Sequence, residues 1–384
     1  MGIKLNVVYI GPSPFPVGGA TTKRKRYMID YMNEHNIESH YLVCDFKQKE
    51  KVVNPIEGSY GKCTYRDITN IANNKKFLTF WKEGKKQLSK WYNPQSKNIL
   101  IFNTILHWQA YPFYKFAIKK GYHIVFDQVE TSMLLSGKSS FLHKINIIVS
   151  ECLSHGAYKR SAGFVISSAL LKDNRDRFPH RKLCLLPNST PILCSKTKKE
   201  LNTPLQLLYA GTYAPKDGVS YLINGVIQAK EKGCDCKLIL LGKGEEKDME
   251  ILELAKDKDY ISYLGFVSDE ELVQYLLQSD VLCMTRTNSR FANYGFPFKL
   301  SEYLATSNIV LATNVGDVSE YVKDKESAFI VEPENSTAIA YAIIDIINNP
   351  ESALKIAGNG FEVMKMNFSI ENVGRRFINF LNKI

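Results

Sequence analysis

The chain has 384 residues, of which 45% are apolar and 23% charged, a composition typical of a soluble globular protein with two or three domains. These values exclude a disordered chain, a collagen-like repeat and a small disulfide scaffold. No run reaches the roughly 18 consecutive apolar residues that a membrane-spanning helix needs. Residues 1–10 lead directly into a Pro/Gly loop, unlike a signal peptide, so we expect a cytoplasmic protein. The eight cysteines include no CxxC pair and are interpreted as reduced thiols rather than zinc ligands.

The net charge of +11 is unevenly distributed along the chain. Residues 1–200 carry 32 Lys and Arg against 14 Asp and Glu, whereas residues 201–384 carry 18 against 25. Such asymmetry indicates that the first half faces a polyanion, which could be nucleic acid, an anionic membrane surface or a phosphorylated substrate. No recognised nucleic-acid-binding motif is present, so we do not expect nucleic acid as a partner.

Both halves alternate apolar strand-like runs with helical patterns. In the first half, a strand at 4–10 leads through a Gly/Pro loop into a helix at about 20–35, and further strands are predicted at 40–44, 98–102, 122–126 and 163–166. In the second half, strands are predicted at 205–210, 237–241, 260–264, 281–284, 309–313 and 328–331. Ser268 and Glu271 have the spacing of a capping box, which predicts a helix start between the third and fourth of these strands.

This alternation predicts two parallel, doubly wound α/β domains. We place a Rossmann-like N-terminal domain at 1–190, a Pro-, Ser-, Thr- and Lys-rich linker at 191–203, and a Rossmann-like C-terminal domain at 204–366. The last segment, 367–384, is expected to form a helix that crosses back to the first domain. Ligands of such open sheets bind beyond the carboxyl ends of the strands, so we expect the site in a cleft between the domains.

Three loops carry residues suited to a phosphorylated ligand. Gly18 and Gly19 precede a predicted helix, whose N-terminal amides and dipole favour an anion, although a simple packing turn would also use glycines. Lys216 lies near another helix start, where its ammonium group would either neutralise a diphosphate or lie in a surface turn. Lys299 and Glu302 share one face of a helix that begins near residue 298. A lysine for phosphate and a carboxylate for ribose hydroxyls suit a sugar nucleotide, but an isolated pair of this kind is more often a salt bridge.

A basic segment at 75–91 interleaves six lysines with apolar side chains. At helical spacing the apolar residues Phe77, Phe80, Trp81, Leu88 and Trp91 form a stripe. Two interpretations of the stripe remain open, since it suits an interfacial helix on anionic lipid and also a helix packed on its own sheet, the latter being favoured for the aromatic residues. For the lysines, together with the basic run at 23–26, the favoured partner is an anionic membrane surface.

Six segments of the second half resemble, in order, the nucleotide-sugar domain of glycosyltransferase family 4, a family of retaining enzymes with the GT-B fold. The segments are LLYAGTYAPKDG (207–218), LILLGKGEE (238–246), YLGFVSDEELVQYL (263–276), DVLCMTRT (280–287), GFPFKLSEYLA (295–305) and VLATNVGDVSEYV (310–322). The first half adds IGPSPFPVGGATT (10–22), VISSALLKD (165–173) and LLPNST (185–190). The resemblance runs through most of the chain and implies two Rossmann-like domains facing a cleft, with a nucleotide diphosphate sugar as the donor.

The resemblance also implies roles for individual residues on both sides of the cleft. The implied donor-binding residues are Gly211, Thr212 and Lys216 at the phosphates, Gly242 beside the nucleotide, Phe266 and Val267 at the base, Lys299 and Leu300 at the diphosphate, Glu302 at the ribose, and Gly18 and Gly19 across the cleft. Many members have two glutamates eight positions apart, and Tyr294 stands where the first would be. Sugar recognition is therefore expected from Asn293 and from the backbone at Gly295 and Phe296, which leaves the transferred sugar open.

Two first-domain residues compete as the catalytic group. His107 is an imperfect match to a histidine that family members often place near a strand end, and a core histidine is an equal alternative. Glu130, with Asp127 beside it, is the second candidate. Retaining members are usually thought to let the leaving diphosphate deprotonate the acceptor, so the main chemical demand is to stabilise negative charge. Lys216 and Lys299 suit that role. The only DxD sequence, 257–259, is interpreted as a solvated loop, so no metal and no other cofactor are expected.

The favoured function is a retaining hexosyltransferase that moves a sugar from a nucleotide diphosphate sugar, with UDP as the preferred nucleotide. The acceptor would be lipid-linked or a polysaccharide in cell-surface glycan synthesis, such as lipopolysaccharide or capsule, reached from the inner face of the plasma membrane. A sugar-nucleotide epimerase of the same fold is one alternative. A non-catalytic protein that binds anionic membranes is another, although it leaves segment 293–305 unexplained.

Overall fold

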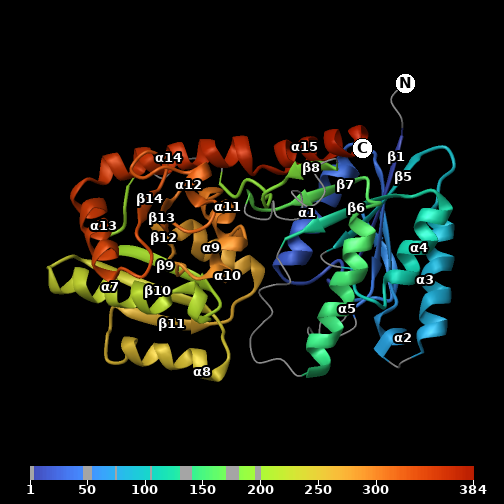
Figure 1. The fold of residues 1–384 in the computed structure, drawn as a ribbon. Coiled ribbons are helices and arrows are strands. Elements are labelled where there is room, and N and C mark those ends of the chain that lie inside the picture. Colours follow the sequence, from blue (N-terminus) through green and yellow to red (C-terminus); the bar gives the residue numbers. More distant parts are fainter. Residues whose placement is uncertain are drawn as a thin grey trace. The chain divides into compact units, whose positions relative to one another are not determined.

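The computed structural model describes residues 4–45, 54–73, 76–103, 106–129, 141–169, 181–194 and 200–384, and it divides the chain into two compact units. Unit 1 comprises Met1–Ser189 together with Ile370–Ile384, and unit 2 comprises Thr190–Ser369 (Figure 1). Within the expected linker at 191–203, residues 195–199 lie outside the described residues. No described helix is both long enough and apolar enough to cross a membrane.

Unit 1 is built on an eight-stranded sheet in the order β3-β4-β2-β1-β5-β6-β7-β8, in which only the β3–β4 pair is antiparallel. The strands are β1 (Leu5–Gly11), β2 (Glu38–Val43), β3 (Glu57–Tyr60), β4 (Cys63–Asp67), β5 (Lys97–Asn103), β6 (His123–Gln128), β7 (Gly163–Ile166) and β8 (Lys182–Leu185). The five strands expected in this half correspond to β1, β2, β5, β6 and β7, which are mostly buried as parallel strands should be. The hairpin β3–β4 and strand β8 were not predicted.

Helices cover both faces of this sheet. The helices of unit 1 are α1 (Ala20–Glu34), α2 (Thr69–Asn73), α3 (Phe77–Trp91), α4 (Tyr111–Lys120), α5 (Phe141–Tyr158) and α15 (Ile370–Lys383). Side chains of α3, α4 and the end of α5 share one core with Val8 and Leu100, whereas α1 and α15 share the opposite core with Val7 and Ile99. The sheet of unit 1 is therefore the middle layer of three.

The apolar stripe of α3 faces the protein's own sheet. Phe80, Leu88 and Trp91 are buried, and Phe77 and Trp81 pack partly buried against the same core. The Trp81 indole N–H donates to the carbonyl oxygen of Gln109 at 2.9 Å. Of the two interpretations of the stripe, packing on the sheet is the one that the structure shows, and the aromatic side chains are not available to lipid.

Unit 2 is built on a six-stranded, all-parallel sheet in the order β11-β10-β9-β12-β13-β14. Its strands are β9 (Leu205–Gly211), β10 (Cys236–Gly242), β11 (Ile261–Gly265), β12 (Val281–Met284), β13 (Ile309–Thr313) and β14 (Phe329–Val331). All six expected strands are present, and two of them, β12 and β13, have the predicted bounds. The central strands β9, β12 and β13 are apolar runs packed on both faces of the sheet, as parallel sheets require, whereas the edge strand β11 is mostly exposed.

Helices and short 3₁₀ segments connect these strands. They are η3 (Pro215–Asp217), α7 (Val219–Glu231), α8 (Glu246–Met249), η4 (Glu250–Ala255), α9 (Asp269–Gln278), α10 (Arg290–Tyr294), α11 (Phe298–Leu304), α12 (Val318–Tyr321), α13 (Ser336–Asn348) and α14 (Pro350–Asn367). The capping box predicted for α9 is confirmed, because the Ser268 hydroxyl accepts from the Glu271 amide and the Glu271 carboxylate accepts from the Ser268 amide. The helix expected near residue 298 is α11, which begins at Phe298.

Candidate functional site

The strand order of unit 2 creates a switch point between β9 and β12. From β9 the chain proceeds outward through β10 and β11, and β12 then returns to the other side of β9 before β13 and β14 continue in the opposite direction. Open α/β sheets bind ligands at the carboxyl ends of strands beside such a point. The loops that follow β9 and β12 meet there, since the Thr287 amide donates to the Lys216 carbonyl oxygen at 3.0 Å. Gly218 has φ +63°, and a Cβ there would lie 2.0 Å from the Thr285 carbonyl oxygen.

Lys299 extends from the first turn of α11 to the end of β9. Its ammonium group donates to the Tyr209 hydroxyl at 3.0 Å and lies 3.6 Å from a carboxylate oxygen of Asp217. The Lys299 side chain is 20% exposed, so it is mostly enclosed but reachable from solvent. A Cβ on Gly211 would lie 2.3 Å from the Lys299 nitrogen. The glycine at the end of β9 therefore makes room for the ammonium group.

Asp217 and Tyr209 fix the position of that ammonium group. Asp217 is 5% exposed, and its second carboxylate oxygen accepts from the Thr212 hydroxyl at 2.6 Å. The Tyr209 hydroxyl donates to the Thr212 carbonyl oxygen while it accepts from Lys299. The loop after β9 thus supplies the carboxylate, the hydroxyl and the backbone that hold Lys299.

Two further cations, Arg286 and Lys216, act on the charge of Lys299. The pKa of Lys299 is lowered, mainly by burial. The charge of Asp217 opposes this effect, whereas the charges of Arg286 and Lys216 lower the pKa further. Arg286 is 8% exposed and donates to the Gly295 carbonyl oxygen at 2.9 Å. Sequence reasoning missed both Arg286 and Asp217. Cationic side chains at the strand ends suit the phosphate groups of an anionic ligand.

Gly242 lies beside this cluster at the end of β10. Its φ is +112°, and a Cβ there would lie 1.9 Å from the Gly211 carbonyl oxygen, so only glycine fits. The Tyr263 hydroxyl donates to the Gly242 carbonyl oxygen at 3.0 Å. Phe266 is 73% exposed, with the Lys243 ammonium 5.0 Å from its ring centre, whereas Val267 is half-buried against the core. The exposed Phe266 ring offers a flat apolar face near the strand end.

The segment before α11 mixes engaged and buried side chains. Asn293 uses both ends of its amide inside the protein, donating to Asn288 at 2.8 Å and accepting from the Gly316 amide at 2.9 Å. Phe296 is buried in the core, and Leu300 is completely buried. The side chains of Phe296 and Leu300 are therefore not available for direct contact with a donor. Phe296 could still contribute through its backbone, and Leu300 through the packing that supports Lys299.

Glu302 is half-buried one turn after Lys299 on the same short helix. Thr212 is exposed and Lys216 half-buried in the loop after β9. The charge of Lys216 contributes to the lowered pKa of Lys299. The predicted phosphate-binding residues of unit 2 thus gather around one point of the sheet.

In unit 1 the corresponding switch point lies between β1 and β5. Gly18 and Gly19 lie in the loop after β1, and α1 begins directly after them. A Cβ on Gly18 would lie 2.4 Å from the Thr22 hydroxyl oxygen, so this glycine also has a packing role. His107, in the loop after β5, is half-buried with a ring nitrogen 3.5 Å from the Ser150 hydroxyl. Glu130 lies outside the described residues.

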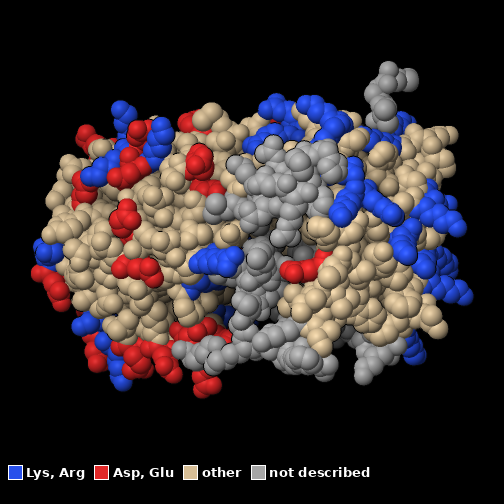
Figure 2. Space-filling model, in the orientation of Figure 1, with Lys and Arg blue, Asp and Glu red and all other residues tan. Residues whose placement is uncertain are grey.

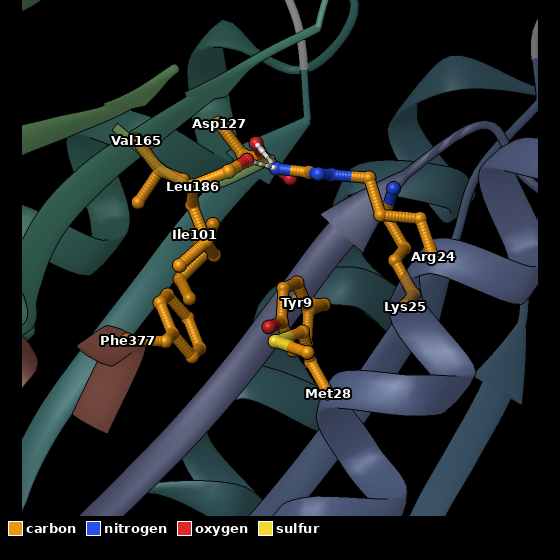
Figure 3. A pocket seen from close by; sticks show the side chains of 9 residues that line it. All are labelled: Tyr9, Arg24, Lys25, Met28, Ile101, Asp127, Val165, Leu186 and Phe377. Atoms are coloured by element: carbon orange, nitrogen blue, oxygen red, sulfur yellow. Dashed lines mark hydrogen bonds and ion pairs between the residues drawn. The ribbon is translucent and has the colours of Figure 1, made fainter. Parts of the chain in front are cut away.

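A buried charge cluster lies between α1 and the sheet of unit 1 (Figure 3). Arg24 donates to Asp127 at 3.3 Å and to Asn188 at 2.9 Å, and these side chains are buried. Lys25 is 1% exposed, its ammonium group has no hydrogen-bond partner among the described residues, and burial lowers its pKa to about 8. Two of the four residues in the basic run at 23–26 therefore face the interior and cannot contact a membrane. The cavity beside them, lined in part by Tyr9, is small, with a volume of about 10 Å³.

Metal-ligating side chains do not cluster in the described part of the chain, where no group of three or more His, Cys, Asp or Glu could hold an ion. The eight cysteines are free thiols, and only Cys152 is exposed. The expectation that the reaction needs no metal stays a prediction.

The chain is similar to known glycosyltransferases over part of its length. Residues 195–363 match the family model described as "Glycosyl transferases group 1". An uncharacterized glycosyltransferase of Methanocaldococcus jannaschii is 28% identical over 41% of this chain and 42% of its own length. A lipopolysaccharide 1,2-N-acetylglucosaminetransferase of Salmonella typhimurium is 26% identical over 56% of this chain and 61% of its own length. These matches therefore span only about half of the curated relatives.

The whole chain also resembles a solved structure. Anabaena Alr3699/HepE, crystallised in complex with UDP, superposes with a TM-score of 0.70 over 99% of this chain and 100% of its own, at 13% identity. A likeness at this identity shows the fold alone. The two units are Rossmann-like domains of the GT-B fold, as expected from the sequence.

Proposed function

We propose that this protein is a retaining glycosyltransferase of family 4, which transfers a sugar from a UDP-sugar to a lipid-linked or polysaccharide acceptor of the cell surface. The observation that carries the proposal is the cluster of Lys299, Arg286 and Lys216 at the β9–β12 switch point of unit 2. The match of residues 195–363 to group 1 glycosyltransferases supports the same reaction class. The lipopolysaccharide transferase among the relatives supports a glycan acceptor.

The proposed chemistry is electrostatic. The bond between the anomeric carbon and the diphosphate breaks, the acceptor oxygen forms a new bond to that carbon on the same face, and negative charge develops on the leaving diphosphate oxygens. Lys299 and Lys216 would stabilise that charge, and an oxygen of the departing diphosphate would take the proton of the acceptor hydroxyl. Glu302 would bind the ribose hydroxyls and the exposed Phe266 ring would lie against the base. No step requires a protein base, so His107 and Glu130 are proposed to position the acceptor.

The decisive assay is release of UDP from a panel of UDP-sugars, with and without lipid or glycan extract, preceded by a thermal-shift screen of the same donors. Acceptor-stimulated UDP release supports sugar transfer. Isomerisation of the donor sugar without UDP release would show an epimerase, and a protein that neither binds nor turns over any donor would contradict both enzymatic readings.

Variants of the cluster locate the donor site. Lys299→Ala should weaken UDP binding and lower turnover about 100-fold, the loss typical of one group that stabilises an oxyanion. Glu302→Ala should weaken UDP binding with a smaller effect on turnover. Lys325→Ala is the matched control, because Lys325 is an exposed lysine of unit 2 that pairs with Asp345. If both site variants behave like the control, the donor binds elsewhere.

A further inference from the structure

The loop that connects β1 to α1, residues 12–19, lies at the carboxyl end of the unit 1 sheet, and we call it the first loop. It ends in Gly18 and Gly19, and in the described chain no side chain caps the helix that follows, whose first turn contains no acidic residue. Amides at such a helix start suit an anionic group. Figure 2 shows Lys and Arg predominating over the described surface of unit 1 in this view, which favours an anion further. Where those amides point depends on the shape of the first loop.

Asn54, which lies shortly before β3, binds the first loop at two points. The Val17 amide donates to the side-chain oxygen of Asn54 at 3.2 Å, and the side-chain nitrogen of Asn54 donates to the Val17 carbonyl oxygen at 2.9 Å. A side-chain amide that pairs with both backbone groups of one residue fixes the orientation of that residue as well as its position. Val17 directly precedes Gly18, so this contact determines how the chain enters the two glycines.

Phe15 connects the same loop to the hairpin β3–β4. Its ring is 1% exposed and makes edge contacts with Tyr60 of β3 and Tyr65 of β4, at centroid distances of 5.6 and 5.5 Å. Tyr41 of β2 is a third ring partner at 5.1 Å. Aromatic pairs in this geometry stabilise beyond the burial of their surface. The first loop is therefore held by ring contacts with both strands of the hairpin in addition to the hydrogen bonds of Asn54.

The hairpin is anchored in turn on α1. The side-chain nitrogen of Asn33 donates to the Tyr60 carbonyl oxygen at 3.2 Å, and its side-chain oxygen accepts from the Lys62 amide at 3.0 Å. Gly61 has φ +58°, and a Cβ there would lie 2.5 Å from the side-chain nitrogen of Asn33. The hairpin thus contacts the loop before α1 through Phe15 and the last turn of α1 through Asn33.

Strand β3 contributes little to the core of unit 1. It pairs only with β4 at the edge of the sheet, residues 57–59 are exposed, and Tyr60 is half-buried. Its contacts with the first loop and with α1 are what this strand adds to the described structure.

We propose that the hairpin β3–β4 and Asn54 form a brace for the first loop, and that Asn54 is a positioning residue for sugar transfer. Asn54 acts through Val17 and holds the amides at Gly18 and Gly19 where a phosphate group of a substrate meets them. The positioning role rests on the proposed function, whereas the brace itself does not.

The brace is tested without any substrate, by hydrogen exchange of the full chain read by mass spectrometry. Asn54→Ala should speed exchange in the first loop at least about fivefold, since the two hydrogen bonds to Val17 are lost. Asn33→Ala is the matched control, because it removes the same kind of two-point amide contact at the other end of the hairpin. It should speed exchange at 60–62 and leave the first loop unchanged. Wild-type exchange of the first loop in Asn54→Ala, or equal loosening of that loop in both variants, would overturn the brace.

The positioning role is tested by steady-state kinetics on a donor and acceptor that the wild type uses. Asn54→Ala should lower kcat about 10- to 100-fold, the effect of a small misplacement of a binding group. Asn54→Gln, which keeps the amide on a longer side chain, should recover part of the loss. Whichever KM rises with the fall in kcat shows whether the donor or a phosphorylated acceptor supplies the phosphate group.

Asn33→Ala serves here as well, because it should lower the melting temperature about as much as Asn54→Ala while kcat stays near the wild-type value. Equal loss of kcat in the two alanine variants would refute the positioning role and leave the proposed function standing. If the wild type transfers no sugar from any donor, the proposed function fails together with the positioning role, and hydrogen exchange alone decides the brace.

Discussion

Lys299 shows how a few contacts decide the chemistry of the candidate site. Its ammonium group is held by Tyr209 and Asp217, yet burial and two neighbouring cations make the charged form less favourable than in water. A bound diphosphate would add the negative charge that this environment lacks. Lys299 is therefore expected to bind the donor more tightly in its protonated form.

The lowered pKa of Lys299 predicts how donor binding depends on pH. As pH rises, Lys299 loses its proton at a lower pH than an ordinary lysine, whose pKa is about 10.5, so UDP affinity should begin to fall below that pH. Lys299→Arg keeps its charge throughout this range and should flatten the alkaline fall, even if its affinity at pH 7 is lower. Titration calorimetry with UDP between pH 7 and 10 measures both profiles. Parallel profiles would show that another group titrates.

Lys25 destabilises the folded chain, because its charged ammonium group is buried. Its pKa is about 8 in the folded state and ordinary in the unfolded state, so between these values the unfolded state binds more protons and stability rises with pH. Lys25→Met should stabilise unit 1 by about 3 kcal/mol at pH 7 and by about 2 kcal/mol less at pH 9.5. Urea unfolding at the two pH values measures the difference. A gain that does not change with pH would mean that packing, not charge, is responsible.

The sequence predicted which side chains belong to the candidate site better than it predicted the residues that contact them. Lys299, Lys216 and Gly211 could be proposed because each stands in a recognisable loop or helix start. Asp217 and Arg286 lie 82 and 13 residues from Lys299, and no local spacing reveals that two strand ends bring them together. The burial of Arg24 was missed for a similar reason, because its contacts come from β6 and the segment after β8.

Among the elements, those that were predicted share one physical property. Parallel strands buried on both faces are continuous apolar runs, which makes β9, β12 and β13 visible in the sequence. The hairpin β3–β4 is short, half-exposed and polar, so Glu57–Tyr60 carries no such signal. Helix α5 is apolar enough to be noticed, but its sequence does not say that its apolar side faces outward. That direction depends on where Ser154 finds its hydrogen-bond partners.

A substitution at the end of β10 tests the close approach of β9 and β10. Gly242→Ala would place a methyl group 1.9 Å from the Gly211 carbonyl oxygen at a φ of +112°, so the ends of β9 and β10 must separate. We expect a loss of about 1–3 kcal/mol in the stability of unit 2 together with weaker UDP binding, because Gly211 borders Lys299. Gly156→Ala is the control, since a Cβ there meets nothing within 4 Å. Unchanged melting temperature and UDP affinity in Gly242→Ala would contradict the close approach.

At the scale of the whole molecule, the chain leaves unit 1 after Ser189 and returns to it with α15. Val373, Phe377 and Leu381 of α15 are buried in the core that α1 shares with the sheet, and Arg376 donates to the Leu185 carbonyl oxygen at 2.8 Å. A Cβ on Gly374 would lie 2.2 Å from the ring of Tyr31 in α1, so the two helices are in intimate contact. Unit 1 is therefore completed only by the last residues of the chain.

This arrangement predicts that a destabilising substitution in α15 lowers the stability of unit 1 alone. Phe377→Ala should cost about 3–5 kcal/mol, the range for removing a buried aromatic side chain, whereas Asn379→Ala on the exposed side should change little. Hydrogen exchange read by mass spectrometry separates the units. Amides of β1 and β5 should lose protection in Phe377→Ala, while those of β9 and β12 keep it although they lie much closer to α15 in sequence. If protection falls equally in both sheets, the two units unfold as a single cooperative structure, and α15 then stabilises the whole chain rather than its first unit.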